Sequence, residues 1–446
     1  MTVAWRLMRA GLWLVCGLGA AMLVDAAEPA RAAPSSSSAA AWREDDIRAS
    51  RVEPPAAATD ALREAADPAD LLIVPDGDGR YVTLVDDARL EIVRRVATRA
   101  MLPGPPRRSP DGRHAYVGST DGWITKLDLR SLAIVTEVRA GLELRDFALS
   151  SDGRWLLAGN AAPHSVAIFD ADLRLVKTFA ATPRDAATTS RVAAVADAAP
   201  RSSFVVVLQD IPEIWEISYD PRAEDIYDGL VHDYRMGEGV PMRGFLNRKR
   251  SLLGAPLTAE ARNVAFDPAF TTILGAAPAQ GGGSVLQVVN LDVRRRIAAL
   301  ALAGMPRLDA AIVVDWSGRR LMAMPTAAAS ALDVVDLKSW QLVKTIAAPA
   351  PLHFLDRPAG GRFAWAVAAP VGAHGSVVMR LDPATLEAVA DASAAPPRSC
   401  GAPVLGRAGR NAWMRPCAGD ADLVVHDAAT LRPLGRLPLA PAPTRR

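Results

Sequence analysis

Short alternating runs of apolar and polar residues fill the chain from about residue 70 onward. In SPDGRHAYVGSTDGWITKLDLRSLAIVTEVRAG (109–141), a D-G-R turn leads into an alternating strand, a second strand that ends in Asp, and a third strand. The pattern returns in SSDGRWLLAGNAAPHSVAIFDADLRLVKTFA (150–180), where Gly153 follows Gly112 by 41 residues. Glycine supplies the positive φ that a tight turn needs, and alternation gives each strand one face for a neighbouring sheet. A period of about 40 residues predicts the blades of a β-propeller.

The repeat continues to the end of the sequence. Three later regular units begin at WSGRRLMAM, GGRFAWAVA and AGRNAWMRP. Two less regular units surround SSFVVVLQDIPEIWEISYD and FTTILGAAPAQGGGSVLQVVN, and a first unit begins at LLIVPDGDGR. Together these units predict an all-β protein, an eight-bladed β-propeller over residues 70–446 with an insertion at 223–261. Seven blades are the alternative, in which one weak unit is a connection.

The first 27 residues have the pattern of a secretory signal peptide. Arg6 and Arg9 precede an apolar stretch, which small residues follow around Ala26. The alternative is a membrane anchor, but the apolar run of about 15 residues is shorter than the roughly 20 that a span requires. Residues 28–69 are rich in Ala, Ser, Pro and charge, and they predict a disordered linker with one short helix.

Charge and cysteine content narrow the function classes. The 51 basic and 49 acidic residues leave a net charge of +2, which argues against a nucleic acid or an acidic membrane as partner. No C-x-x-C-H motif occurs, so we expect no c-type haem. In the oxidising compartment that export implies, Cys400 and Cys417 could pair, and the alternative is two unpaired thiols.

Two longer stretches are more specific than the repeat. EIWEISYDP and GLVHDYRMGEG, together with the blade pairs, resemble the d1-haem propeller family, which includes cytochrome cd1 nitrite reductase and a dihydro-haem d1 dehydrogenase branch. The resemblance covers almost everything from Asp70 onward. It implies a periplasmic propeller that binds haem d1 or dihydro-haem d1 without a covalent link, in haem d1 maturation or nitrite reduction during denitrification.

The resemblance also implies site residues. Arg145 in GLELRDFAL and Arg191 in TTSRVAAV match family arginines that pair with carboxylates of the macrocycle, a role that suits the guanidinium fork. His164 in AAPHSVAIFD and His232 match histidines of the dehydrogenase branch and are the catalytic candidates, with Arg235 beside His232 as a further cofactor-binding residue. The alternatives are structural: salt bridges for the arginines and a hydrogen-bonded loop position for His232.

Four positions depart from the family pattern. At these positions the family has histidines, whereas this sequence has Pro103, Arg307, Pro358 and Ala402. The histidine that Pro103 replaces is the family's proximal iron ligand. Proline has no side-chain donor or acceptor, so the metal ligand is unknown. The sequence therefore predicts weaker or differently ligated tetrapyrrole binding.

The remaining question is whether such a chain is an enzyme. Hydrogen removal from a macrocycle needs an electron acceptor, so a dehydrogenase of this kind relies on an external c-type cytochrome, or the chain is a carrier that serves a nitrite reductase. The alternative is a haem-free propeller that acts as an interaction or assembly scaffold. Trp123, Trp215 and Tyr219 either line an aromatic pocket or, as we favour, pack between blades.

Overall fold

The computed structural model describes most of the chain beyond residue 41. The described residues are 42–55, 68–76, 80–99, 101–102, 106–183, 187–227, 241–326, 330–356, 364–368, 377–382, 384–391, 404–406, 409–414, 422–430 and 432–439. All structural statements below concern these residues.

The strands of the first four sheets follow one another in chain order. The first sheet contains β1 (Leu71–Pro75), β2 (Tyr81–Asp86) and β3 (Glu91–Ala97). The second contains β4 (Arg107–Arg108), β5 (His114–Gly118), β6 (Trp123–Asp128) and β7 (Ala133–Arg139). The third contains β8 (Glu143–Leu149), β9 (Trp155–Ala162), β10 (Ser165–Asp170) and β11 (Leu175–Ala180). The fourth contains β12 (Val192–Ala198), β13 (Ser203–Leu208), β14 (Glu213–Ser218) and β15 (Arg248–Leu252).

The other four sheets have the same order. The fifth contains β16 (Val264–Phe266), β17 (Thr272–Pro278), β18 (Ser284–Asn290) and β19 (Arg295–Leu302). The sixth contains β20 (Ile312–Trp316), β21 (Arg319–Thr326), β22 (Ala331–Asp336) and β23 (Leu342–Ala347). The seventh contains β24 (Leu352–Asp356), β25 (Ala364–Ala368), β26 (Val377–Asp382) and β27 (Glu387–Asp391). The eighth contains β28 (Val404–Leu405), β29 (Asn411–Met414), β30 (Asp422–Asp427) and β31 (Pro433–Pro438).

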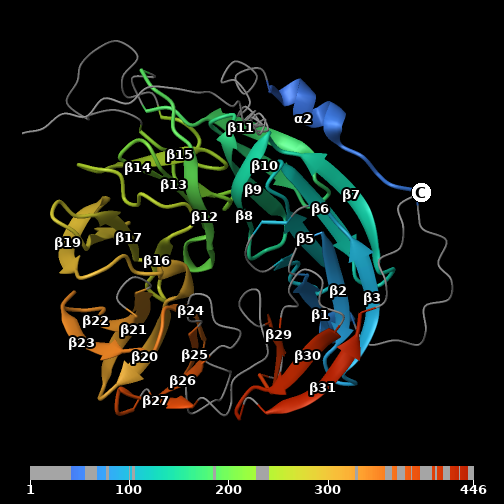
Figure 1. Cartoon of the computed structure of the whole chain (residues 1–446). Coiled ribbons are helices and arrows are strands. Elements are labelled where there is room, and N and C mark those ends of the chain that lie inside the picture. The colour runs from blue at the N-terminus through green and yellow to red at the C-terminus, as the bar shows by residue number, and fades with distance from the viewer. Residues whose placement is uncertain are drawn as a thin grey trace, which may run out of the picture.

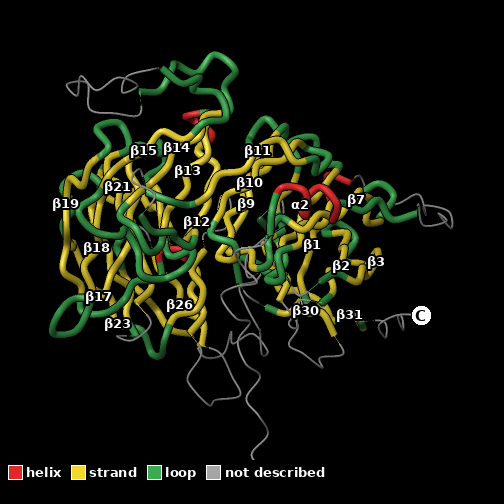
Figure 2. The backbone as a smooth tube through the Cα atoms, turned by 90° about the horizontal axis from the view of Figure 1, so that it is seen from above, coloured by secondary structure: helices red, strands yellow, loops and turns green. Residues whose placement is uncertain are grey.

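The sheets are arranged around a common centre, as in a β-propeller (Figure 1). The first strand of each sheet lies nearest the centre, and the last lies at the periphery. Helix is confined to α2 (Glu44–Ser50) and to the 3-10 turns η1 (Pro68–Asp70), η2 (Ala199–Arg201) and η3 (Leu308–Ala310), so strands dominate the described chain (Figure 2). The prediction of an all-β fold is confirmed. None of the described helices has the length and apolar character needed to cross a membrane.

Apolar faces of neighbouring sheets pack on each other. Between the third and fourth sheets, Leu157 and Ile168 contact a cluster that includes Phe204, Trp215 and Tyr219. Trp215 and Tyr219 are buried there, which confirms the packing interpretation for these two aromatic residues. Burial of such side chains stabilises the fold by about 1.5–3 kcal/mol each, so the contacts between sheets hold the ring together.

The first and last sheets also pack on each other. Leu72 and Val74 of β1 share an apolar cluster with Trp413 of β29 and Val425 of β30. The Trp413 indole Nε1 donates a hydrogen bond to Oδ1 of Asp87 at 2.7 Å, and the Asn411 amide donates to the same carboxylate oxygen at 2.9 Å. This interface joins the two ends of the row of sheets.

The D-G-R turns connect the first and second strands of their sheets. Gly112 and Gly153 have φ values of 71° and 70°, as the sequence pattern predicts. In the first of these turns, the Ser109 hydroxyl donates to Asp111 at 2.5 Å, and the Arg113 backbone N–H donates to the same oxygen at 3.0 Å. An acidic side chain that accepts from the backbone two residues on is an Asx turn, which fixes the hairpin.

The segment that carries α2 differs in part from its prediction. Residues 28–69 were expected to form a disordered linker with one short helix, and α2 is such a helix, but residues 42–55 lie against the outer strands β7 and β11 (Figure 1). Ile47 is 4% exposed and joins the core between the second and third sheets. Val52 exchanges two backbone hydrogen bonds with Glu137 of β7, at 2.8 and 2.9 Å. The segment folds because contacts with the sheets replace the core that it lacks by itself.

The insertion expected at 223–261 is shorter than predicted. Residues 248–252 within it form β15, the outer strand of the fourth sheet, which pairs with β14 from Glu213 to Ile217. The charged sequence RKRSL has no clear alternation, because an outermost strand buries little of its surface.

Candidate functional site

The topology brings several predicted residues to one end of the ring. We call the end where the chain passes from one sheet to the next the connection end, and the opposite end, with the D-G-R turns, the turn end. Because successive strands are antiparallel, the turn between the second and third strands of each sheet also lies at the connection end. Glu143 and Arg145 at the start of β8, His164 between β9 and β10, and Arg191 before β12 therefore share this end.

Arg191 is paired with Asp210, which lies in the turn between β13 and β14. Its Nε and Nη2 donate to the two carboxylate oxygens at 3.0 and 2.5 Å, and its backbone N–H donates at 2.9 Å. The hydrogen bonds from Arg191 lower the pKa of Asp210, and those to Asp210 raise the pKa of Arg191. Both groups are therefore charged, and the fork of Arg191 is occupied by a residue of its own sheet.

Arg145 is only partly engaged. Its Nη2 lies 3.0 Å from Oε1 of Glu143, while its Nε is buried and has no hydrogen-bond partner among the described residues. The strand register shifts between Leu144 and Asp146, so Arg145 has no counterpart on β9 and occupies a β-bulge. Bulges redirect side chains and occur often next to binding sites. The Arg145 side chain is 30% exposed and has donors left for an acceptor from outside.

His164 completes this group of residues. Its Nδ1 lies 2.6 Å from the Thr189 hydroxyl, and the imidazole is close enough to Asp210 to contribute to the lowered pKa of that carboxyl. Glu143 in turn contributes to the raised pKa of Arg191, so the pairs Glu143–Arg145 and Arg191–Asp210 are neighbours. We call Glu143, Arg145, His164, Arg191 and Asp210 the connection-end cluster. It can bind anions through the arginines and hold a proton at His164.

Other predicted residues lie outside the described part of the chain. These are His232, Arg235, Pro103, Cys400 and Cys417, together with the departures Pro358 and Ala402. The loop that carries His232 and Arg235 leaves β14 at Ser218 and returns at Arg248, at the turn end. The strand ends that flank His232 are therefore at the opposite end of the ring from His164.

Sequence reasoning missed Glu143, Thr189 and Asp210. Asp210 follows a run of five apolar residues in SFVVVLQD, so its place in a turn between strands two and three was a usable signal. Arg307, a departure from the family pattern, forms a two-point pair with Asp309 at 2.9 and 2.8 Å. Its guanidinium is thus engaged within its own segment.

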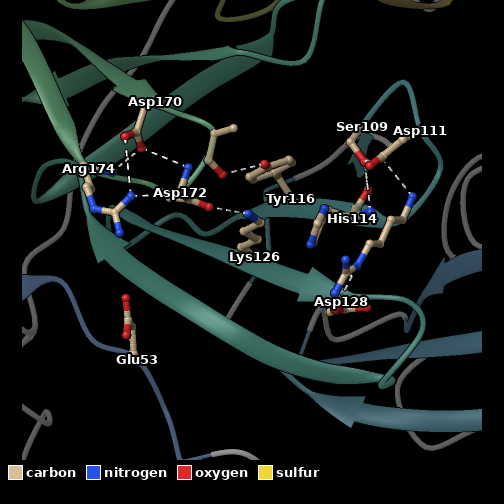
Figure 3. A network of polar contacts seen from close by, with 12 residues as sticks. Glu53, Ser109, Asp111, His114, Tyr116, Lys126, Asp128, Asp170, Asp172 and Arg174 are labelled. Carbon is tan, nitrogen blue, oxygen red and sulfur yellow. Dashed lines mark hydrogen bonds and ion pairs between the residues drawn. The ribbon is translucent and has the colours of Figure 1, made fainter.

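A second polar network lies at the turn end (Figure 3). Lys126 is buried and donates to the Asp172 carboxylate at 2.9 Å, and Asp172 also pairs with Arg174. His114 lies beside it, and burial lowers the pKa of this imidazole. No group of three or more His, Cys, Asp or Glu residues in the described ranges is placed to hold a metal ion. The network connects the second and third sheets, and the connection-end cluster is the better candidate for a ligand.

Comparisons with known proteins agree with this fold. The family model described as the cytochrome D1 heme domain matches residues 66–445. A dihydro-heme d1 dehydrogenase of Pseudomonas aeruginosa is 35% identical over 401 residues, which cover 89% of this chain and 75% of that protein. The solved structure of dihydro-heme d1 dehydrogenase NirN in complex with DHE has a TM-score of 0.74 at 34% identity, and the match covers 89% of this chain and 80% of that one. Protein NirF of Stutzerimonas stutzeri is 37% identical over 118 residues, or 26% of this chain and 30% of NirF.

Proposed function

Because the chain belongs to the cytochrome D1 heme domain family, we propose that it binds a d1-type tetrapyrrole, haem d1 or dihydro-haem d1, without a covalent link. The observation that carries the proposal is the partly engaged guanidinium of Arg145 at the connection end. The similarity to a dehydrogenase solved in complex with DHE over most of both chains supports the choice of ligand. We further propose that the eight sheets are eight blades around this site, spanning residues 70–446.

The donors present fit the carboxylates of such a group. The buried Nε of Arg145 has no partner among the described residues, and leaving a buried donor unpaired costs about 1–3 kcal/mol. A carboxylate from outside would remove this cost and accept a charge-assisted hydrogen bond. Arg191 contributes positive charge, but it must share or release Asp210 before it binds with both nitrogens. Arg145 is thus the main contact, with Arg191 as the secondary one.

The chain's histidines supply proton chemistry. A bound d1-type tetrapyrrole provides a conjugated ring that exchanges electrons. His164, held through Nδ1 by Thr189, keeps Nε2 without a hydrogen bond to the described residues and is the proposed group that holds or moves a proton. His232 and Arg235 stay in the proposal as candidates from the sequence, catalytic and cofactor-binding respectively.

The proposed setting is haem d1 maturation or nitrite reduction in denitrification. Residues 1–27 act as a signal peptide in this proposal, so the chain works in the periplasm, and residues 28–69 join it to the propeller. It acts as a carrier, or as a dehydrogenase of the dihydro-haem d1 kind with a separate c-type cytochrome as electron acceptor. A nitrite reductase is the partner that would receive the tetrapyrrole.

A spectral titration tests this proposal. We expect the purified chain without residues 1–27 to shift the visible spectrum of d1-type haem or its dihydro precursor at micromolar concentrations. Arg145→Ala should weaken binding by about tenfold, because it removes a charge-assisted hydrogen bond worth about 1.5–3 kcal/mol. Arg319→Ala is the matched control, since Arg319 begins β21 at the opposite end of the ring and pairs with Asp336.

The possible outcomes distinguish a tetrapyrrole-binding protein from a haem-free scaffold, and a carrier from a dehydrogenase. Equal affinity in Arg145→Ala and wild type would remove Arg145 from the site. No spectral change with sub-millimolar tetrapyrrole would reject both the carrier and the dehydrogenase, and would leave the haem-free scaffold. Conversion of the dihydro precursor only when an oxidised c-type cytochrome is added would establish the dehydrogenase.

A further inference from the structure

Three charged side chains, two from neighbouring sheets and one from a connection, meet near the centre of the ring. Asp146 lies in the middle of β8 and is 7% exposed. Arg107 comes from β4 of the second sheet, and Arg262 comes from the connection that leads into β16 of the fifth sheet. Nη2 of Arg107 lies 3.8 Å and Nε of Arg262 lies 3.9 Å from the same carboxylate oxygen, Oδ1 of Asp146.

Backbone groups hold the Asp146 carboxylate. The Phe147 N–H donates to Oδ1 at 2.9 Å, and the N–H of Val195 in β12 donates to Oδ2 at 3.0 Å. Both arginine nitrogens are beyond hydrogen-bond distance from this carboxylate. Asp146 thus connects the third and fourth sheets by itself, and the arginines are attracted to it without being bound.

The two guanidinium groups have donors to spare. Nε of Arg107 donates to the Phe147 carbonyl at 3.2 Å, which leaves its Nη groups near Asp146. Arg262 donates its backbone N–H to Ala193, but its side chain makes no hydrogen bond to any residue that the structure describes. That side chain is only 24% exposed. A guanidinium carries five N–H donors, so Arg262 has donors that no residue within the described chain accepts from, and these donors keep contact with water.

The charges are also unbalanced, because two arginines face one carboxylate. We propose that Arg262 and Arg107 bind one small carboxylate or oxyanion beside Asp146, near the axis of the ring. Nη2 of Arg107 and Nε of Arg262 both lie within 3.9 Å of Oδ1 of Asp146, so the two nitrogens are near each other. An anion with two acceptor oxygens would span them. A planar anion matches the guanidinium fork with two hydrogen bonds. The site adjoins the connection-end cluster, since Asp146 follows Arg145 in β8, but it does not rest on tetrapyrrole binding.

The competing interpretation is purely structural, with the arginines serving only to offset the buried charge of Asp146. This role requires their charge but no anion from outside. The two interpretations differ in one measurable respect, which is whether an added anion binds stoichiometrically and depends on Arg262.

Isothermal titration with sodium acetate and with sodium nitrate tests the site on the full exported chain, with sodium chloride to hold the ionic strength constant. We expect one acetate or nitrate per chain. Arg262→Gln should weaken this binding by about tenfold or more, because it removes the charge and the fork. Arg307→Gln is the matched control, since it makes the same change at an arginine already bound by Asp309, and its affinity should equal that of wild type.

Several results would overturn the proposal: no saturable binding in wild type, or equal binding in Arg262→Gln and wild type. Circular dichroism and thermal melting check that each variant is folded. If Arg262→Gln does not fold, Arg107→Gln gives the same comparison, and Arg262→Lys, which keeps the charge without the fork, should bind with intermediate affinity. A loss of acetate binding in Arg307→Gln as well would show a nonspecific charge effect and would also reject the site.

The source of the anion is settled by a second titration. Protein loaded with d1-type haem should lose acetate binding if a carboxylate of the macrocycle occupies the site, and should keep it if the site takes a free anion. A protein that binds acetate but no tetrapyrrole would support this site while rejecting the proposed function.

Discussion

Arg145 and Arg191 lie at the same end of the ring with similar exposure, 30% and 40%, but their guanidinium groups are in different states. Both nitrogens of the Arg191 fork are bound by Asp210, whereas Nε of Arg145 has no partner in the described chain. Sequence predicted both arginines as equivalent, because a motif shows residue type but not the partner that folding brings. The partner of Arg191 lies 19 residues further along, across a hairpin.

Asp197 gives a prediction for the pH dependence of stability. Burial raises its pKa to about 6, while a hydrogen bond of 2.8 Å from the Tyr219 hydroxyl acts in the opposite direction. A carboxyl with a raised folded-state pKa stabilises the fold fully below its unfolded pKa of about 4, and loses this contribution as the pH rises through about 6. The difference in free energy of unfolding between Asp197→Asn and wild type should therefore change by about 1 kcal/mol between pH 4.5 and 7.5.

Urea unfolding at the two pH values measures this difference. Wild type should lose stability relative to Asp197→Asn as the pH rises, and a difference that does not change with pH would show that Asp197 titrates normally. Asp152→Asn is a suitable control for the neighbouring carboxylate, which helps to raise the pKa of Asp197.

At the scale of elements, the sequence predicted the regular strands and one short helix before them, but not that this helix packs on the sheets. Alternation and D-G-R turns located the regular strands because each strand reports its own burial with a period of two. Helix α2 has seven residues and a single buried one, Ile47, so it has no period to detect. Its order comes from contacts with β7 and β11, which lie far away in the sequence.

Ile47→Ala should weaken the attachment of residues 42–55 to the sheets by about 2 kcal/mol, because it removes the one buried apolar side chain of α2. Hydrogen exchange at the Glu137 amide measures this, since that N–H is protected by the Val52 carbonyl. Exchange there should accelerate, while exchange within the fifth sheet should stay unchanged. Asp45→Ala, at a side chain that is 98% exposed, is the control, and equal exchange in the two variants would contradict the role of Ile47.

For the whole molecule, closure between the first and last sheets is the feature that sequence could only imply. The repeat predicts similar sheets, but nothing in a repeat shows that its first and last units touch. Asp87, Asn411 and Trp413 form that contact over more than 300 positions. Such a contact depends on the number of sheets and the angle between neighbours, which are properties of the entire ring.

Trp413→Ala should lower the free energy of unfolding by about 3–5 kcal/mol, because it leaves a cavity and removes the bond to Asp87. The loss should be local in space: hydrogen exchange should increase in β1 and β30 before it increases in β13. Phe204→Ala, between the third and fourth sheets, is the comparison and should show the reverse order. Uniform acceleration in both variants would mean that the ring opens only as a unit.

Residues 42–55 hold the second and third sheets together at their outer strands, the positions of largest radius (Figure 1). A restraint at the circumference controls the angle between two sheets more tightly than an equal restraint near the axis, because its lever arm is longer. Arg107 and Arg145 belong to these two sheets and lie near the axis. We therefore expect that loosening the peripheral segment would rotate the two sheets relative to each other and so change the spacing of two inner arginines that the segment does not touch.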